Sequence, residues 1–399
     1  MRFVLCAACF GWIAWPALAG DVGVPPPSPA AQAWTQTLNW TWVAERALYL
    51  LLPLGLLLSG WSARLGATFE RCAGGRRYVA LILFASTLLL ISAVLRLPLN
   101  AVRHLAYPGK FPDSLGQWWA GQAEALVLPL ACIALLLWIP YWLMRRSPRR
   151  WWLWLAIVAA PLSFAALVLQ PAWMAFSTNG YEPLKDEALS AEIRGMAGQC
   201  GVPDIHVVVG GGDTTVVGLG PTNRVILASD LLKTETPAQI RFTVAHELKH
   251  YVMGDNWKAW AIIVLFVLSA FCFAHMAGRF AIARWGVWMG FSRLDDVRSL
   301  PLLILCVTLF WIAITPVFLT YDRHIEREAD RFGLELSREN DAAAQLFASW
   351  VGPTELAEPG WFARTTRGSH PSTAERIRMA QSYRPWATGE SLQYATICR

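Results

Sequence analysis

Charged residues are scarce in this sequence. Asp, Glu, Lys and Arg make up only 16% of its 399 residues, whereas hydrophobic residues make up 55% and the mean hydropathy is +0.38. Soluble domains carry about a quarter charged residues. The 22 Trp fit this picture, because Trp gathers at the headgroup level of bilayers. The composition therefore predicts a multi-pass membrane protein.

A basic face or a nucleic-acid-binding motif is also missing. The net charge is +6, but the Arg residues lie in short loops between apolar runs. The positive-inside rule of membrane proteins explains that placement better than phosphate binding does, so we expect no nucleic-acid partner.

The eight Cys show no zinc-finger spacing. Cys132, Cys272 and Cys306 fall inside apolar runs, where small buried hydrophobes are expected. Cys200 and Cys398 flank the polar part of the chain. They could form a disulfide if that part faces an oxidising compartment.

Residues 1–19 are typical of a secretory signal peptide. A charged start and a short apolar stretch lead to Ala17-Leu18-Ala19, which resembles a cleavage site. An uncleaved first span is the alternative. A proline-rich linker is predicted at 20–45, because the run from Val24 to Pro29 is too rich in proline for a helix.

Six apolar segments follow, most of them near the length needed to cross a bilayer as helices. The connections on one side of these segments carry twelve Arg, whereas the opposite loop, 96–121, carries two Arg and one Lys. The side with twelve Arg is therefore predicted to be cytoplasmic in a cell inner membrane, with both polar parts of the chain on the other side. The segments are 46–62, 78–95, 122–144, 151–170, 257–276 and 299–320.

The first polar part, 172–256, reads as a small α/β unit. Short runs rich in Val and Ile predict strands, and longer runs predict helices. The expected elements are a helix at 191–199, strands at 205–209, 214–217 and 224–227, and a helix from Ala238.

The last of these helices carries the sequence His246-Glu247-Leu248-Lys249-His250. Two His four residues apart project from one helix face and can bind one Zn²⁺, and Glu247 can act as general base on a zinc-activated water. No third His follows six residues after His250, because Asn256 stands there. A carboxylate from elsewhere must therefore complete the site.

Glu326 is the best candidate for that carboxylate. It follows the sixth apolar segment by six residues, and His250 precedes the fifth by seven. Both would stand about 10 Å above the same membrane face. Asp330 lies one turn further on the same face and would hold a ligand His, whereas Glu328 points elsewhere. A charged, solvated helix is the alternative for this stretch.

These motifs resemble the membrane zinc metallopeptidases that include CAAX prenyl protease 1 and the bacterial heat-shock protease HtpX, and the prenyl-protease branch most. The resemblance covers about residues 40–385, and it implies that Glu326 is the third zinc ligand. It also implies that His370 and Arg376 lie across the cleft, where they stabilise the tetrahedral intermediate or position substrate. The residues that carry it are 245–250, 326–330, 369–371, 376–377, 179–184 and 218–224.

The sequence departs from the family pattern in places that bear on substrate preference. Lys249 stands where the family usually has Gly, and Asp255 stands where a His commonly follows. Asp213 and Thr214 replace the usual Asn-Ala on the strand that pairs with substrate. Backbone pairing tolerates such changes, so the predicted substrate-binding residues are still Thr214, Thr215, Val216 and Val217.

Orientation is a further difference. Prenyl-protease relatives cut on the cytosolic side, whereas the charges here place the site outside, with the cytosol-facing arrangement as the alternative. Membrane or periplasmic polypeptides are then better candidate substrates than prenylated cytosolic proteins.

Together these features predict an α-helical multi-pass membrane protein with a small α/β gluzincin-type zinc peptidase domain split by a transmembrane hairpin. The predicted function is hydrolysis of membrane-associated or unfolded polypeptides with one Zn²⁺ per chain. A non-catalytic membrane scaffold with a vestigial zinc site is the alternative. The predicted parts are a four-helix bundle at 46–171, a first peptidase part at 172–256, the hairpin at 257–320 and a second peptidase part at 321–399.

Overall fold

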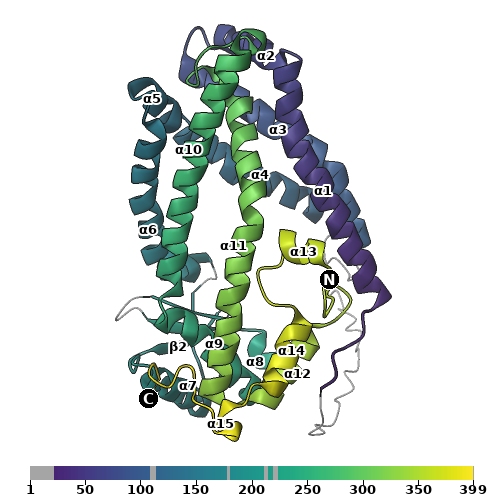
Figure 1. Cartoon of the computed structure of the whole chain (residues 1–399), viewed down its shortest axis with the longest axis vertical. Helices are drawn as coiled ribbons and strands as arrows, with labels where there is room; N and C mark the ends of the chain where they lie inside the picture. Colours follow the sequence, from purple (N-terminus) through teal and green to yellow (C-terminus); the bar gives the residue numbers. More distant parts are fainter. Residues whose placement is uncertain (1–21, 108–113, 178–179, 211–213, 219–222, 399) are drawn as a thin grey trace, which may run out of the picture.

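The structure is a computed structural model of the chain that describes residues 22–107, 114–177, 180–210, 214–218 and 223–398. The predicted signal peptide lies outside these residues. Long helices form a bundle, and a smaller α/β part lies at one end of it (Figure 1).

Six helices of the described chain are long and apolar enough to cross a membrane, which confirms the multi-pass prediction. In Figure 1, α10 and α11 run along most of the length of the molecule and form the predicted hairpin. The six are α1 (Pro29–Leu58), α3 (Arg77–Ala106), α4 (Leu115–Leu136) continued by α5 (Trp138–Arg146), α6 (Trp151–Ser177), α10 (Asp255–Met289) and α11 (Leu300–Ser337).

The Arg-rich connections lie at the end of the bundle that is remote from the α/β part (Figure 1). A short helix there, α2 (Trp61–Cys72), packs on the single turn η2 (Val297–Ser299) that precedes α11. The Ser62 hydroxyl donates to the Arg298 carbonyl at 2.6 Å, and the Arg298 guanidinium pairs with Glu70 at 2.8 Å. These contacts fix the start of α11 and hence the direction in which it crosses the bundle.

Two predicted loops are helical in the structure. The linker expected at 20–45 ends at Ser28, which caps α1 by accepting from the Ala31 amide at 3.0 Å, because proline is favoured in the first turn of a helix. The loop expected at 96–121 shrinks to the short connection between α3 and α4. Its Arg103 pairs with Glu45 of α1 at 3.0 Å, so this charge has a partner on a neighbouring helix.

The α/β part contains a four-stranded sheet in the order β1-β2-β4-β3. β2 and β4 are parallel and the other pairs are antiparallel. Helix α7 (Glu187–Gln199) starts four residues before its predicted start, because Asp186 accepts from the Leu189 amide and caps it. The strands are β1 (Glu182–Pro183), β2 (His206–Gly210), β3 (Thr215–Val217) and β4 (Arg224–Ala228), and the short α8 (Leu231–Thr234) follows them.

Helix α9 (Pro237–Val252) lies between two hydrophobic cores. It begins at a capping box in which the Thr236 hydroxyl accepts from the Gln239 amide and the Gln239 side chain accepts from the Thr236 amide. One core joins it to the sheet and α7, and the other joins it to α12 (Asn340–Trp350) and α14 (Thr373–Ser382).

The end of α11 that leaves the bundle packs along α9. Gly333 makes this close approach possible, because a Cβ there would meet the Phe242 ring at 3.0 Å and the His246 backbone nitrogen at 3.3 Å. The two halves of the peptidase region therefore meet along one helix pair, although the hairpin separates them in sequence.

The C-terminal segment returns to the first half of this region. The backbone amides of Gln393 and Tyr394 donate to Glu335 of α11 at 2.8 and 2.9 Å. A disulfide then joins Cys200, at the end of α7, to Cys398. The pairing considered from the sequence is thus present in the structure. The short helices α13 (Trp361–Thr366) and α15 (Pro385–Thr388) complete the fold.

Candidate metal centre

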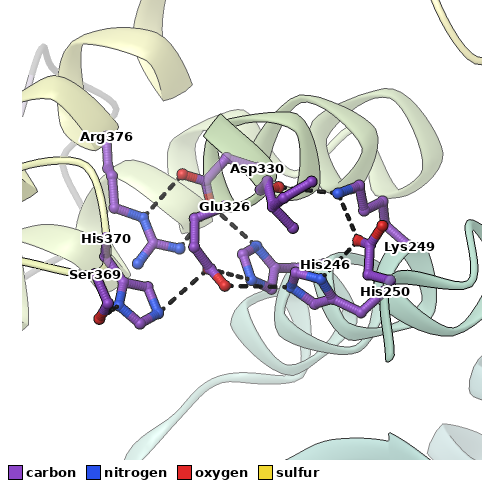
Figure 2. A network of polar contacts seen from close by, with 10 residues as sticks. His246, Lys249, His250, Glu326, Asp330, Ser369, His370 and Arg376 are labelled. Atoms are coloured by element: carbon purple, nitrogen blue, oxygen red, sulfur yellow. Dashed lines mark hydrogen bonds and ion pairs between the residues drawn. The ribbon is translucent and has the colours of Figure 1, made fainter. Parts of the chain in front are cut away.

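Helices α9 and α11 bring the three predicted ligands together (Figure 2). His246 and His250 lie one turn apart on α9, and Glu326 faces them from α11. The Glu326 carboxylate is 3.2 Å from His246 Nε2 and 3.5 Å from His250 Nε2. One ligand atom from each residue lies within 4.8 Å of the other two, which is close enough for a single ion.

Each imidazole is held by a carboxylate on its other nitrogen. His246 Nδ1 is 3.0 Å from Asp330 Oδ1, and His250 Nδ1 is 3.0 Å from Asp255 Oδ2. A carboxylate at Nδ1 holds a proton there, so Nε2, which faces Glu326 in both rings, is the nitrogen left to bind a metal ion. This is the arrangement in which zinc proteins present histidine.

The residues present fit a divalent cation. Glu326 Oε2 is buried and accepts no well-aligned hydrogen bond, although two imidazole nitrogens lie 3.2 Å away. Burial lowers the pKa of His246, but the nearby carboxylates of Asp330 and Glu326 outweigh it and raise the pKa to about 9. The carboxylates therefore give the site a negative electrostatic potential, which favours a cation. Two imidazoles and one carboxylate are a donor set typical of catalytic zinc.

Glu247 follows the first ligand on α9 and is half-buried. Burial raises the pKa of this carboxyl above its usual value, and the charge of Glu326 acts in the same direction. Since Glu247 is adjacent to the ligand set and binds none of its atoms in the structure, its carboxylate is available for a proton.

His370 approaches the site from the opposite side of Glu326 to α9 (Figure 2). Its Nε2 is 3.2 Å from Glu326 Oε2, and its Nδ1 is 2.9 Å from the Ser369 hydroxyl. The side chain is 54% exposed, in contrast to His246 at 8%. His370 therefore lies at the rim of the site, where a substrate can reach it.

Arg376 contacts the site through a carboxylate. Its guanidinium makes two hydrogen bonds to the buried Asp330, of 2.9 and 2.5 Å. It also stacks over the Phe347 ring, with 4.2 Å from Cζ to the ring centroid. The structure thus connects Arg376 to the metal centre through Asp330 and His246.

Lys249 and Asp255, two departures from the family pattern, contact each other. Lys249 Nζ is 2.7 Å from Asp255 Oδ2, the oxygen that also accepts from His250. Sequence reasoning did not join them. The missed signal was a Lys on the buried face of α9, followed after Gly254 by the carboxylate of Asp255.

Glu328 faces away from the ligands, as its angular position on the helix predicts. Its carboxylate accepts from the Gln393 amide group at 2.7 Å and from the Tyr394 hydroxyl at 2.5 Å. It holds the C-terminal segment in place.

Within the described residues, the predicted substrate-binding strand lies at the edge of the sheet. β3 covers Thr215, Val216 and Val217 and pairs with β4 on one side. Thr214 precedes it and accepts from the Ala228 amide at 3.0 Å. β3 packs against α9, which places a sheet edge next to the helix that carries the ligands. Asp213 lies outside the described residues.

The chain is similar to known proteins over most of its length. Residues 183–384 match the family model of peptidase family M48, and residues 30–176 match the model described as CAAX prenyl protease N-terminal, five membrane helices. An uncharacterized metalloprotease of Bacillus subtilis (strain 168), YhfN, is 26% identical, with 96% of this chain and 95% of the relative covered.

The fold has a solved counterpart. The crystal structure of S. mikatae Ste24p superposes with a TM-score of 0.62 at 16% identity, covering 90% of this chain and 100% of that chain. The family resemblance and the fold class inferred from the motifs are thereby confirmed.

Proposed function

The chain belongs to peptidase family M48 and is a membrane metalloprotease, and from this premise we propose that it hydrolyses membrane-associated or unfolded polypeptides with one zinc ion. The convergence of His246, His250 and Glu326 within 4.8 Å carries the proposal. The remaining roles follow from the positions of neighbouring side chains.

His246, His250 and Glu326 would hold the ion. Bound zinc would supply Lewis-acid activation of the scissile carbonyl and of the attacking water. Glu247 lies beside two of the ligands, so it is placed to take a proton from that water and to pass it to the leaving amine. A carboxylate without other partners suits both steps.

His370 is the side chain best placed to contact the substrate at the reacting bond. It is exposed at the rim and reaches Glu326 Oε2 at 3.2 Å, so a carbonyl oxygen bound near Glu326 would lie within its reach. A donor aimed at the developing oxyanion is worth roughly 3–4 kcal/mol of transition-state stabilisation. Ser369 supports the ring through its hydrogen bond to Nδ1.

An extended peptide is the expected form of the substrate. β3 offers a sheet edge beside α9, and strand addition at such an edge uses backbone hydrogen bonds that tolerate varied side chains. This favours polypeptides that are unfolded or extended near the membrane.

We further propose that the catalytic region faces the non-cytoplasmic side. The Arg-rich connections lie at the opposite end of the bundle, which supports this orientation by the positive-inside rule. The disulfide between Cys200 and Cys398 also supports it, because disulfides persist in oxidising compartments and are rare in the cytosol.

The test compares the wild-type protein with Glu247→Gln, both full-length and in detergent. Zinc content is measured by atomic absorption, and cleavage is measured on casein and on an unfolded membrane protein. We expect both proteins to bind one zinc ion and only the wild type to cleave. The substitution keeps the shape of the side chain but removes the base.

Two results would overturn the proposal. Equal cleavage by both proteins would remove Glu247 from the reaction. Absence of cleavage by zinc-loaded wild type would favour the non-catalytic scaffold that the sequence left as the alternative.

A further inference from the structure

Lys249 is a buried cation in the helix that carries the ligands. Its side chain is 3% exposed, although it lies between the ligand His246 and the ligand His250 in sequence. Burying a charged group costs several kcal/mol unless partners compensate for the lost water. The contacts of its ammonium group therefore indicate what this position does.

The first contact is with the carboxylate that orients His250. Lys249 Nζ and His250 Nδ1 lie 2.7 and 3.0 Å from the same oxygen of Asp255. Asp255 begins α10, and the left-handed conformation of Gly254 (φ 65°) turns the chain so that Asp255 comes back beneath α9. Lys249 thus holds the Asp255 carboxylate, which in turn orients the His250 ring.

The second contact reaches the other ligand helix. Lys249 Nζ lies 2.9 Å from the backbone carbonyl oxygen of Ile325, the residue that precedes Glu326. One ammonium group therefore links α9 to α11 at the turn that carries the third ligand, and Figure 2 shows its place beside that turn.

The other half of the site is built in the same way. His246 is held by Asp330, and Asp330 is held by the buried Arg376. Each predicted ligand His thus has its own carboxylate, and each carboxylate has its own buried cation. The two chains of contacts approach the site from opposite sides of Glu326 in Figure 2.

We propose that Lys249 is a positioning residue that holds His250 and Glu326 in ligating geometry and so sets the affinity of the site for its metal ion. This inference rests on the metal site of the proposed function. It assigns Lys249 no part in the hydrolytic step, because its ammonium group is occupied by the Asp255 carboxylate and the Ile325 carbonyl oxygen.

The test uses Lys249→Met, which keeps most of the side-chain length and removes the charge. Zinc affinity of the full-length protein in detergent is measured by competition with a chromogenic chelator. We expect the Kd for zinc to rise about 10–100-fold, the range typical when a partner of a metal ligand is removed.

Lys258→Met is the matched control. Lys258 contacts the other oxygen of Asp255 at 3.3 Å, but its side chain is 49% exposed. Since exposed ion pairs contribute little, its removal should change the Kd for zinc by less than about threefold.

The outcomes separate the inference from the proposed function. Wild type that binds no zinc would overturn the metal site and this inference with it. Tight zinc binding by the wild type and by Lys249→Met alike would overturn the inference alone, as would a variant that loses only thermal stability.

If Lys249→Met fails to accumulate, Asp255→Asn is measured in its place. It keeps the shape of the carboxylate, and we expect a comparable rise in the Kd for zinc. Unchanged affinity in Asp255→Asn would equally overturn the inference, because the chain of contacts from Lys249 to His250 passes through this carboxylate.

Discussion

Arg376 and Asp330 form a bidentate ion pair in the centre of the peptidase region. Arg376 Nε lies 2.9 Å from one oxygen of Asp330, and Nη2 lies 2.5 Å from the other. Asp330 is fully buried and Arg376 is 5% exposed. Because Asp330 also accepts from His246, we expect Arg376 to act on the proposed metal site by fixing the carboxylate that orients His246.

Arg376→Gln should therefore weaken zinc binding and stability together. It leaves the Asp330 carboxylate buried without its cation, which typically costs about 3–5 kcal/mol of folding free energy. We expect the Kd for zinc to rise about 10–100-fold. Chelator competition and thermal denaturation in detergent measure the two effects.

Arg378→Gln is the control for this prediction. Arg378 lies two residues further along α14 and pairs with the exposed Glu358, so its loss should leave zinc affinity unchanged. If Arg376→Gln keeps wild-type stability and zinc affinity but loses cleavage, Arg376 acts on the tetrahedral intermediate instead.

The assignment of the third ligand is tested by two neighbouring glutamates. Glu326→Gln removes the anionic oxygen that faces both His, so we expect the Kd for zinc to rise about a hundredfold or more. Glu328→Gln lies on the same turn but contacts the C-terminal segment, so zinc affinity should persist while the melting temperature falls. Both are measured on purified full-length protein, and loss of zinc from Glu328→Gln alone would reverse the assignment.

The long elements of this protein could be predicted because their signal is periodic and local. Apolar runs identified the six spans, and the spacing of His246 and His250 placed both on one helix face. Glu326 could be chosen because the lengths of α10 and α11 fix the heights of the ligands. The structure places all three in one site for these reasons.

The contacts of Lys249 and Arg376 could not be predicted in this way. Whether Lys249 is buried depends on the turn at Gly254 and on the approach of α11, which residue spacing does not specify. Arg376 reaches Asp330 because α14 packs against α12 and so faces α11. Such contacts depend on tertiary packing. From the sequence alone, a Lys or Arg near a motif is as consistent with an exposed side chain as with one in the cleft.

The helix starts were missed for a local reason. Several prolines in a row before α1 predict a non-helical segment. A single proline at the first helical position, however, favours a helix. Pro29 follows the capping residue Ser28, so the predicted linker ends there.

The disulfide between Cys200 and Cys398 should stabilise the peptidase region. The bridge joins residues 198 positions apart, and removal of a native disulfide typically costs roughly 2–5 kcal/mol. We expect Cys200→Ala with Cys398→Ala to melt at lower temperature with unchanged zinc content. Peptide mapping without reductant should recover the two cysteines in one linked species, while the exposed Cys72 is alkylated. Alkylation of Cys200 and Cys398 without reductant would contradict the pairing.

The orientation of the site decides which substrates can meet it, and a pair of reporters measures it. Alkaline phosphatase, which needs an oxidising compartment to fold, should be active when fused after Arg399, whereas a fluorescent protein at that position should remain dark on export. Fusions after Arg150, between α5 and α6, should give the opposite pattern because four Arg lie in this connection and at the end of α5. The reverse result would place the ligands in the cytosol. It would also require Cys200 and Cys398 to be reduced in cells, since cytosolic thiols rarely pair. The reporters and the disulfide thus test one orientation by independent chemistry. Reporters that place Arg399 in the cytosol, together with a bridge in the purified protein, would show that the bridge forms only after extraction from the cell.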